Sequence, residues 1–265
     1  MALEVLAPTR NIIGFPVTAL PFQAQIQLML EWASHRLSKV VCVANVHMLM
    51  EAHSNPTFAS VLANSDMVTP DGMPIVWLMK MMGDREQDRV AGMDILLALC
   101  QQSPSRKVSV FFLGSEREIL SQMRQKLRRD FPNLQIAGME PLPFRPLTPQ
   151  EDEVIVRRIN ASGAGIVFVS LGCPKQEVWM SQHQSKIKAV MIGLGGAFPV
   201  YAGIHKWAPL WIRNMGFEWL YRLIQEPRRL WKRYCRTIPP FVYLAFRQVL
   251  INLVQVQRSP SREKS

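Results

Sequence analysis

The sequence lacks the motifs of most metal-dependent and nucleotide-binding enzymes. It contains no GxxxxGK, GxSxG or HExxH motif and no Asp-x-Asp pair, the usual metal clamp on nucleotide-sugar diphosphates. Its four cysteines are far apart and form no Cys-x-x-Cys pair (Cys42, Cys100, Cys173 and Cys235). This spacing argues against a zinc ribbon or a disulfide framework and fits a reducing compartment. We therefore predict no metal site and no cofactor.

The sequence also lacks a clear leader or membrane span. Residues 1–14 have no basic segment followed by an apolar run, so we expect no signal peptide. The most apolar stretch, residues 238–256, is interrupted by Arg247, Gln248 and Asn252. Because Gln248, Asn252 and Gln255 share one helical face, the spacing favours an interfacial helix, or a helix packed on another subunit, over a span.

What the chain does have is a very uneven distribution of charge. Residues 204–265 hold 12 Lys and Arg against 3 acids, whereas residues 1–203 hold 19 against 17. Four of the seven tryptophans lie in the same basic tail (Trp207, Trp211, Trp219 and Trp231). A near-neutral body with a basic, aromatic tail predicts a catalytic unit that docks on an anionic membrane or nucleic acid. We place the boundary near Gly203, with a catalytic domain at 1–203 and a docking appendage at 204–265.

Continuous apolar runs alternate with helical patterns through the body. Their composition predicts strands at 39–45, 108–114, 165–172 and 189–195, and helices at about 22–37 and 47–63. Capping boxes predict two more helices, one starting at Ser115 with Glu118 and one at Thr148 with Glu151. This order predicts an α/β fold with a Rossmann-like parallel sheet covered by helices on both faces. Ligands bind where such strands end, which makes Gly114 and Gly172 candidate binding-loop residues.

Asp71 lies in the turn TPDGMP, between two prolines and followed by Gly72. A carboxylate held in so rigid a turn can act as a general base, and Gly72 beside it is a candidate substrate-binding residue. It can also simply cap the helix that Pro74 begins, and the local sequence by itself favours this second interpretation.

Two glycine-containing loops suggest sites for a phosphate or a sugar. LGCPKQE (171–177) starts a helix whose backbone amides can receive a phosphate, with Lys175 adding charge and Gln176 directional hydrogen bonds. GLGG (193–196) fails the dinucleotide pattern, because Phe198 replaces the third glycine. Gly195 and Gly196 therefore indicate close packing or close approach of a ligand.

Cations of the tail form a third candidate site. Arg222, Arg229 and Lys232 are 7 and 3 residues apart, so a continuous helix places them on one side. Such a cluster fits phosphate or diphosphate oxygens, although a solvated helix face has the same pattern.

These pieces resemble, in their order, the WecG/TagA/CpsF glycosyltransferase family. The matching motifs are NVHM after the first long strand, PDGMPIVW, RVAGMD, VFFLG, FVSLGCPKQE, GLGGAFPVYAG and APLWIRNMGFEWLYRLIQEPRR. The resemblance runs from about residue 10 to 236. It implies an inverting, metal-independent transfer of a sugar from a UDP-sugar to a polyprenyl-diphosphate-linked glycan, in cell-surface polysaccharide synthesis. It also implies a peripheral enzyme on the inner face of the cell membrane, in assemblies of more than one chain.

The resemblance assigns roles residue by residue and reverses the local interpretation of Asp71, which becomes the catalytic base. Asn45 falls near the reacting sugar, Gln176 beside the nucleotide-sugar, and Arg89 in a binding motif. The tail cations Arg222, Arg229 and Lys232 fall where the acceptor diphosphate is bound.

Several positions depart from the family pattern. Val43 and His47 flank Asn45 where T-x-N-x-E is frequent, Pro199 stands where an Asp often follows G-G-x-F, and Trp207 replaces an Arg. Each is expected in or near the pocket. The donor sugar is therefore left open among N-acetylmannosamine, its uronic acid and another hexose such as glucose.

Other functions explain part of the sequence. A nucleic-acid-binding protein would use the basic aromatic tail, but this function gives no role to the PDG, PKQE and GLGG loops. We therefore expect no nucleic-acid partner. A nucleotide-binding oxidoreductase is weakened by the missing dinucleotide motif, and a catalytically inactive membrane adaptor is compatible with the departures.

Overall fold

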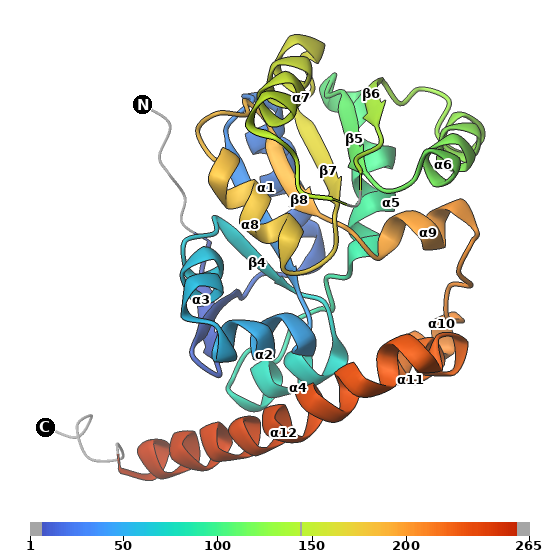
Figure 1. Cartoon of the computed structure of the whole chain (residues 1–265). Coiled ribbons are helices and arrows are strands. Elements are labelled where there is room, and N and C mark those ends of the chain that lie inside the picture. The colour runs from blue at the N-terminus through green and yellow to red at the C-terminus, as the bar shows by residue number, and fades with distance from the viewer. Residues whose placement is uncertain (1–6, 144, 259–265) are drawn as a thin grey trace, which may run out of the picture.

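The computed structural model describes residues 7–143 and 145–258 and is built on a six-stranded parallel sheet (Figure 1). The strand order is β4-β3-β8-β7-β5-β6. The strands are β3 (Lys39–Ala44), β4 (Met67–Pro70), β5 (Val110–Gly114), β6 (Ile136–Glu140), β7 (Ile166–Ser170) and β8 (Val190–Gly193). All pairings are parallel, so the predicted α/β class is confirmed and every strand ends at one edge of the sheet.

Helices cover both faces of the sheet. On one face lie α1 (Phe22–Ser34), α5 (Gly92–Gln102), α6 (Arg117–Asp130) and α9 (Ala197–Ala202), with the 3₁₀ turn η1 (Ser103–Arg106) after α5. On the other lie α2 (Val46–Ser54), α3 (Pro56–Ala63), α4 (Met73–Met81), α7 (Pro149–Ser162) and α8 (Lys175–His183). The antiparallel hairpin β1 (Thr9–Ile12) and β2 (Phe15–Thr18) packs on this second face.

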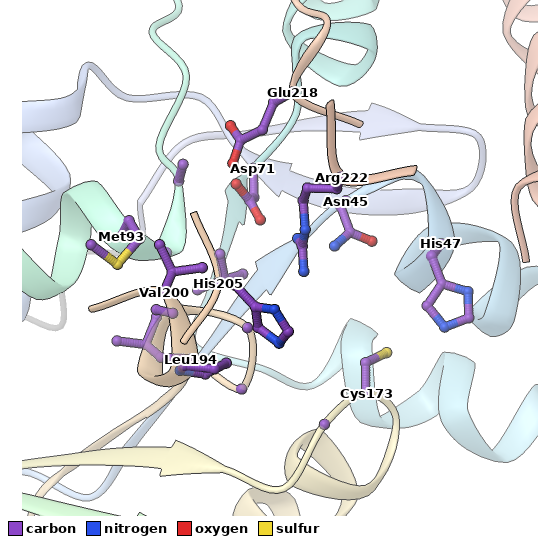
Figure 2. A pocket seen from close by; sticks show the side chains of 18 of the residues that line it. Asn45, His47, Asp71, Met93, Cys173, Leu194, Val200, His205, Glu218 and Arg222 are labelled. Carbon is purple, nitrogen blue, oxygen red and sulfur yellow. The ribbon is translucent and has the colours of Figure 1, made fainter. Parts of the chain in front are cut away.

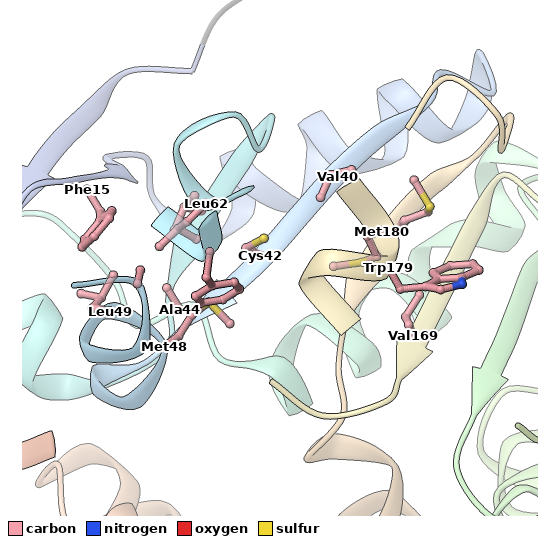
Figure 3. Close-up of a cluster of buried hydrophobic side chains, with 14 of the residues drawn as sticks. Phe15, Val40, Cys42, Ala44, Met48, Leu49, Leu62, Val169, Trp179 and Met180 are labelled. Atoms are coloured by element: carbon pink, nitrogen blue, oxygen red, sulfur yellow. The ribbon is translucent and has the colours of Figure 1, made fainter. Parts of the chain in front are cut away.

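Alternate residues of each strand enter the two cores, as a buried parallel sheet requires. In β3, Val40, Cys42 and Ala44 join the α2–α8 side (Figure 3), while Val41 and Val43 join the α1–α5 side. Because the side chains on both faces of each strand are buried, the strands are continuous apolar runs in the sequence.

Two of three predictions about helix starts and ends differ from the structure. The helix expected at 47–63 is broken at Asn55, whose side chain accepts a hydrogen bond from the Phe58 N–H and caps α3, while Pro56 fits the first turn. The capping box at Ser115 is wrong, because Ser115 has φ +67° and α6 begins after Glu116 without a side-chain cap. The box at Thr148 is confirmed, with both reciprocal hydrogen bonds present.

The appendage consists of α10 (Leu210–Asn214), α11 (Glu218–Gln225) and α12 (Pro227–Arg258). The continuous helix expected through Arg222 and Lys232 is interrupted, since α11 ends at Gln225 and Pro227 starts a new helix. Figure 1 shows α12 running along the body beside α2 and α4.

The side of α12 turned toward the body carries the polar Gln248 as well as the buried Phe241. Gln248 accepts a hydrogen bond from the Ile13 N–H (2.8 Å) and donates one to the Asn11 carbonyl (2.7 Å). The opposite face exposes apolar side chains, together with Arg247 (Val242, Tyr243, Phe246, Leu250, Ile251, Leu253 and Val254). By length and composition alone, Pro227–Val254 passes as a possible membrane span, and its 18-residue apolar window has a mean hydropathy of 1.3. The interfacial helix that the sequence favours stays a prediction.

Candidate active site

The site begins where β3 and β4 end side by side. Ala44 pairs with Pro70 in the sheet, so the next residues, Asn45 and Asp71, leave neighbouring strands at the same edge. The Asp71 N–H donates to the Ala44 carbonyl at 2.8 Å, which fixes the turn. Two residues far apart in the sequence are thus brought together by strand register alone.

A cavity of about 220 Å³ lies at this edge, beneath the appendage. Its walls come from the loops after β3, β4, β7 and β8, from the start of α5 and from α11 and α12 (Figure 2). Seven predicted substrate-binding or catalytic residues line it (Asn45, Asp71, Arg89, Gly172, Gln176, Gly195 and Gly196). Val43, His47, Pro199 and Trp207 also line it, which confirms that the departures from the family pattern lie at the pocket.

Asp71 presents its carboxylate to the cavity rather than to the backbone. Gly72 is the N-cap of α4 and no side chain caps that helix, so the capping interpretation is wrong. Within the described ranges, the Asp71 side chain has no hydrogen-bond or ion-pair partner. Burial and then the negative charge of Glu218 raise the pKa of Asp71, Arg89 and Arg222 oppose the rise, and the resulting pKa is about 8. A carboxyl with this pKa can exchange a proton near neutral pH.

Asn45 caps a helix and also lines the cavity. It caps α2, with its Oδ1 accepting a hydrogen bond from the Met48 N–H at 3.1 Å. Its carboxamide nitrogen stays available to a ligand in the cavity, where Figure 2 shows Asn45 beside Arg222.

Gln176 joins the two glycine loops. Its Oε1 accepts hydrogen bonds from the Gly172 and Gly195 N–H groups, each at 3.1 Å, and its Nε2 donates to Glu177 Oε1 at 2.7 Å. A Cβ at Gly195 would stand 2.7 Å from that oxygen, so only glycine fits there. Glu177 is fully buried, and burial raises its pKa to about 6. Gln176 therefore holds the shape of the loops that face a ligand.

Four predicted site residues lie outside this cavity. Gly72 is the cap of α4, and Gly114 packs against the Ser170 backbone with φ +90°. Lys175 is the first residue of α8 and does not line the cavity. Lys232 lines a second cavity of about 570 Å³ between α2 and α12.

The cations of the appendage differ in their partners. Arg229 lines the first cavity but is paired with Glu226. Arg222 lies over Gly196, where an added Cβ would come within 3.4 Å of its guanidinium. Arg233 is half-buried and lines both cavities. Among the residues that the structure describes, neither Arg222 nor Arg233 has a carboxylate partner for its side chain.

Sequence reasoning missed an ion-pair chain that fastens the appendage over the site. Arg213 pairs with Asp94 (3.3 Å), Asp94 with Arg89 (2.9 Å) and Arg89 with Glu218 (2.5 Å). Arg213 also stacks on Trp207, 3.9 Å from the ring centroid. The partners are up to 129 residues apart, so local spacing gives no sign of the pairing. Elsewhere, the described part of the chain has no cluster of three His, Cys, Asp or Glu that could hold a metal.

The arrangement matches known proteins along nearly the whole chain. Residues 10–254 fit the model of the glycosyl transferase WecG/TagA/CpsF family. The chain is 34% identical over 203 residues to the N-acetylglucosaminyldiphosphoundecaprenol N-acetyl-beta-D-mannosaminyltransferase of Bacillus spizizenii, covering 76% of each chain. It is 29% identical over 218 residues to the protein of the same name from Bacillus subtilis, covering 82% of each.

Proposed function

The chain belongs to the WecG/TagA/CpsF glycosyltransferase family, and we propose that it moves a sugar from a UDP-sugar to a polyprenyl-diphosphate-linked sugar, with inversion and without a metal ion. The observation that carries this proposal is Asp71, a carboxylate with a raised pKa and no partner among the described residues, turned into a cavity that has cations on its walls. The names of the two relatives describe transfer of an N-acetylmannosaminyl group to N-acetylglucosaminyl-diphosphoundecaprenol, which supports this class of acceptor.

In the proposed reaction Asp71 takes the proton of an acceptor hydroxyl. The hydroxyl oxygen forms a bond to the anomeric carbon of the donor from the face opposite the diphosphate. The bond from that carbon to the diphosphate breaks, and its electron pair leaves with UDP. A single displacement of this kind inverts the configuration at the anomeric carbon. Holding base, acceptor and donor in one cavity lowers the entropic part of the barrier.

The leaving diphosphate needs positive charge as the bond breaks. Arg222 stands over Gly196 in the glycine loop, so its guanidinium and the backbone amides of that loop can stabilise the same phosphate oxygens. In a cavity shielded from water such fixed donors act strongly. They take the part that a divalent ion plays in metal-dependent transferases, and a chelator is therefore expected to leave the rate unchanged.

The acceptor diphosphate fits the second cavity. Lys232, Arg233 and Arg236 line it, with Glu51 as the acidic lining residue. Arg233 and His47 line both cavities, so an anion bound there lies beside the cavity that holds the base. A half-buried guanidinium without a carboxylate partner favours binding of an anion, because pairing offsets its lost hydration.

The outer face of α12 suits the lipid part of such an acceptor. Its exposed apolar residues follow Pro240, which lines the second cavity, and Trp211, Trp219 and Trp231 of the appendage are exposed as well. We place this surface on the inner face of the cell membrane, with the Gln248 side of α12 held by the body. Aromatic side chains at the headgroup level and the basic appendage both favour an anionic bilayer.

The identity of the donor sugar is the most specific part of the proposal. N-acetylmannosamine is supported by the names of the relatives. Pro199 and Trp207 line the cavity where the family pattern has charged residues, so its uronic acid and other hexoses remain candidates. Pro199 in place of the family's Asp removes a negative charge and favours an anionic sugar. Trp207 in place of the family's Arg removes a positive charge and disfavours an anionic sugar.

UDP release tests the proposal directly. The purified full-length protein is given a panel of UDP-sugars with and without a polyprenyl-diphosphate-sugar acceptor, beside Asp71→Asn and with a chelator. Acceptor-dependent release from one donor, lost in Asp71→Asn and unchanged by the chelator, supports the proposal. Release that requires a divalent ion contradicts the metal-free mechanism, and binding to vesicles without release from any donor supports the inactive-adaptor alternative.

A further inference from the structure

Glu218 places a second carboxylate beside Asp71. It is the first residue of α11, so it belongs to the appendage, whereas Asp71 belongs to the sheet edge. Figure 2 shows the two carboxyl groups near each other in the cavity, with Arg222 close by. We propose that Glu218 is a positioning residue of the transfer reaction: the docked appendage uses it to set how readily Asp71 takes the acceptor proton. The inference rests on the proposed function.

The position of the Glu218 carboxylate is fixed by ion pairs. Arg89 donates to it at 2.5 Å and to Asp94 at 2.9 Å, and the Arg89 side chain is only 14% exposed. Arg213, 11% exposed, pairs with the other oxygen of Asp94. Anions and cations therefore alternate along one chain that begins and ends in the appendage. Such a network holds Glu218 in place only while the appendage is docked.

The charges around Asp71 come from three sides of the cavity. Glu218 and Arg222 reach it from α11, Arg89 from the segment before α5, and Asp94 from α5 itself. Burial is the largest cause of the raised pKa of Asp71, and Glu218 is the next. Arg89 and Arg222 lower that pKa, and Asp94 raises it slightly. Glu218 is thus the largest single charge that strengthens Asp71 as a base.

This strengthening serves the chemistry. A carboxylate with an ordinary pKa is ionised at neutral pH but takes a proton weakly from a sugar hydroxyl. A base whose pKa lies near the working pH combines useful ionisation with stronger proton uptake. Since Glu218 belongs to the appendage, the strength of the base depends on the appendage being in place. Proton transfer is thereby linked to appendage docking.

The test is the pH dependence of kcat/KM in Glu218→Gln, whose amide oxygen can still accept from Arg89. From about pH 5.5 to about pH 9.5, we expect the acid limb to shift to lower pH by at least half a unit, and the plateau rate to fall roughly three- to tenfold. Glu226→Gln is the matched control. It removes the same charge from the same cavity wall, but Glu226 is not among the groups that act on Asp71. The acid limb of the kcat/KM profile of Glu226→Gln should stay at the wild-type pH, whatever the plateau rate of this variant.

An unchanged limb in Glu218→Gln, or an equal shift in Glu226→Gln, overturns the inference. Glu218→Asp retains the charge and should keep the limb near wild type, and thermal unfolding of all variants shows whether each is folded. If the wild-type protein transfers no sugar from any donor, the proposed function fails but Glu218 remains testable. Titration of the ¹³C-labelled Asp71 carboxyl by NMR must then give a lower pKa in Glu218→Gln, and an equal pKa refutes the role.

Discussion

His47 of α2 and Arg233 of α12 both line the two cavities, and the charge of Arg233 acts on the His47 imidazole. Burial and then the positive charge of Arg233 lower the pKa of His47 to about 4. His47 Nδ1 is buried without a hydrogen-bond partner among the described residues. A neutral imidazole and an unpaired guanidinium thus lie together at the junction, an arrangement that an anion would change.

We predict that pyrophosphate raises the pKa of His47. A bound diphosphate offsets the charge of Arg233 and favours the imidazolium form. The His47 ring proton, followed by NMR from about pH 4 to about pH 8, should titrate at higher pH with pyrophosphate than without it. The His53 signal is the internal control, because His53 lies on the same helix and lines neither cavity. A His47 titration that ignores pyrophosphate would contradict the placement of the acceptor diphosphate.

The lowered pKa of His47 predicts that the folded protein loses stability at acidic pH. The folded-state pKa of His47 lies below its ordinary value near 6.5. Its contribution to stability is therefore complete above about pH 6.5 and is lost as the pH falls toward 4. His47→Gln should lose less of its unfolding free energy than wild type between about pH 7 and pH 4. Urea unfolding at both pH values measures the difference, and equal losses would show that His47 does not titrate in this way.

Asp71→Asn should abolish transfer and stabilise the fold. Loss of the base is expected to lower the rate by about 10² to 10⁴-fold. Because folding raises the pKa of Asp71 from about 4 to about 8, its protonated form is favoured, and wild type loses stability as the pH rises through this window. The variant should therefore exceed wild type by at least about 1 kcal/mol at pH 8 and by little at pH 4. Thermal unfolding at the two pH values tests the sign, and a less stable variant at pH 8 would refute it.

Much of the fold is visible in the sequence. Apolar runs locate β3, β5, β7 and β8, and the Thr148 capping box locates the start of α7. The strand β4 is harder, because only four residues with a terminal proline form it. Its pairing with β3 is nevertheless what brings Asp71 next to Asn45. The register between β3 and β4 cannot be predicted from local propensity. The turn TPDGMP, considered alone, therefore favours an Asp that caps a helix.

The appendage shows the other limit of sequence reasoning. The positive charge and tryptophans identify it, but Glu218 is one of its three acids and nothing in the local sequence distinguishes it. Its partner Arg89 is distant in the chain, and only the folded structure joins them. Pro227 likewise breaks the helix, so Lys232 faces the second cavity instead of joining Arg222 at the first. Periodicity fails wherever one proline changes the direction of a helix.

Gln176→Leu should damage both the fold and UDP binding. The change leaves the Gly172 and Gly195 N–H groups and Glu177 Oε1 without their shared partner. We expect a loss of about 1–3 kcal/mol in unfolding free energy and at least a tenfold weaker affinity for UDP. Gln182→Leu is the matched control, since it is exposed on the same helix. Calorimetric titration with UDP and chemical unfolding give the two values, and wild-type affinity in Gln176→Leu would show that the loops keep their shape unaided.

The outward apolar face of α12 makes a specific prediction about membrane binding. Phe246 is 63% exposed on that face, and Phe246→Glu places a charge where acyl chains would lie. Removing the apolar group and adding a buried charge should weaken binding to anionic vesicles by at least about tenfold. Leu37→Glu is the matched control, because Leu37 is also exposed but lies on the body. Both proteins change charge equally, so a loss confined to Phe246→Glu in vesicle co-sedimentation cannot arise from electrostatic repulsion alone. Equal loss in both would mean that charge rather than insertion of α12 governs binding, and raising the salt concentration would then release wild type as readily as the variants.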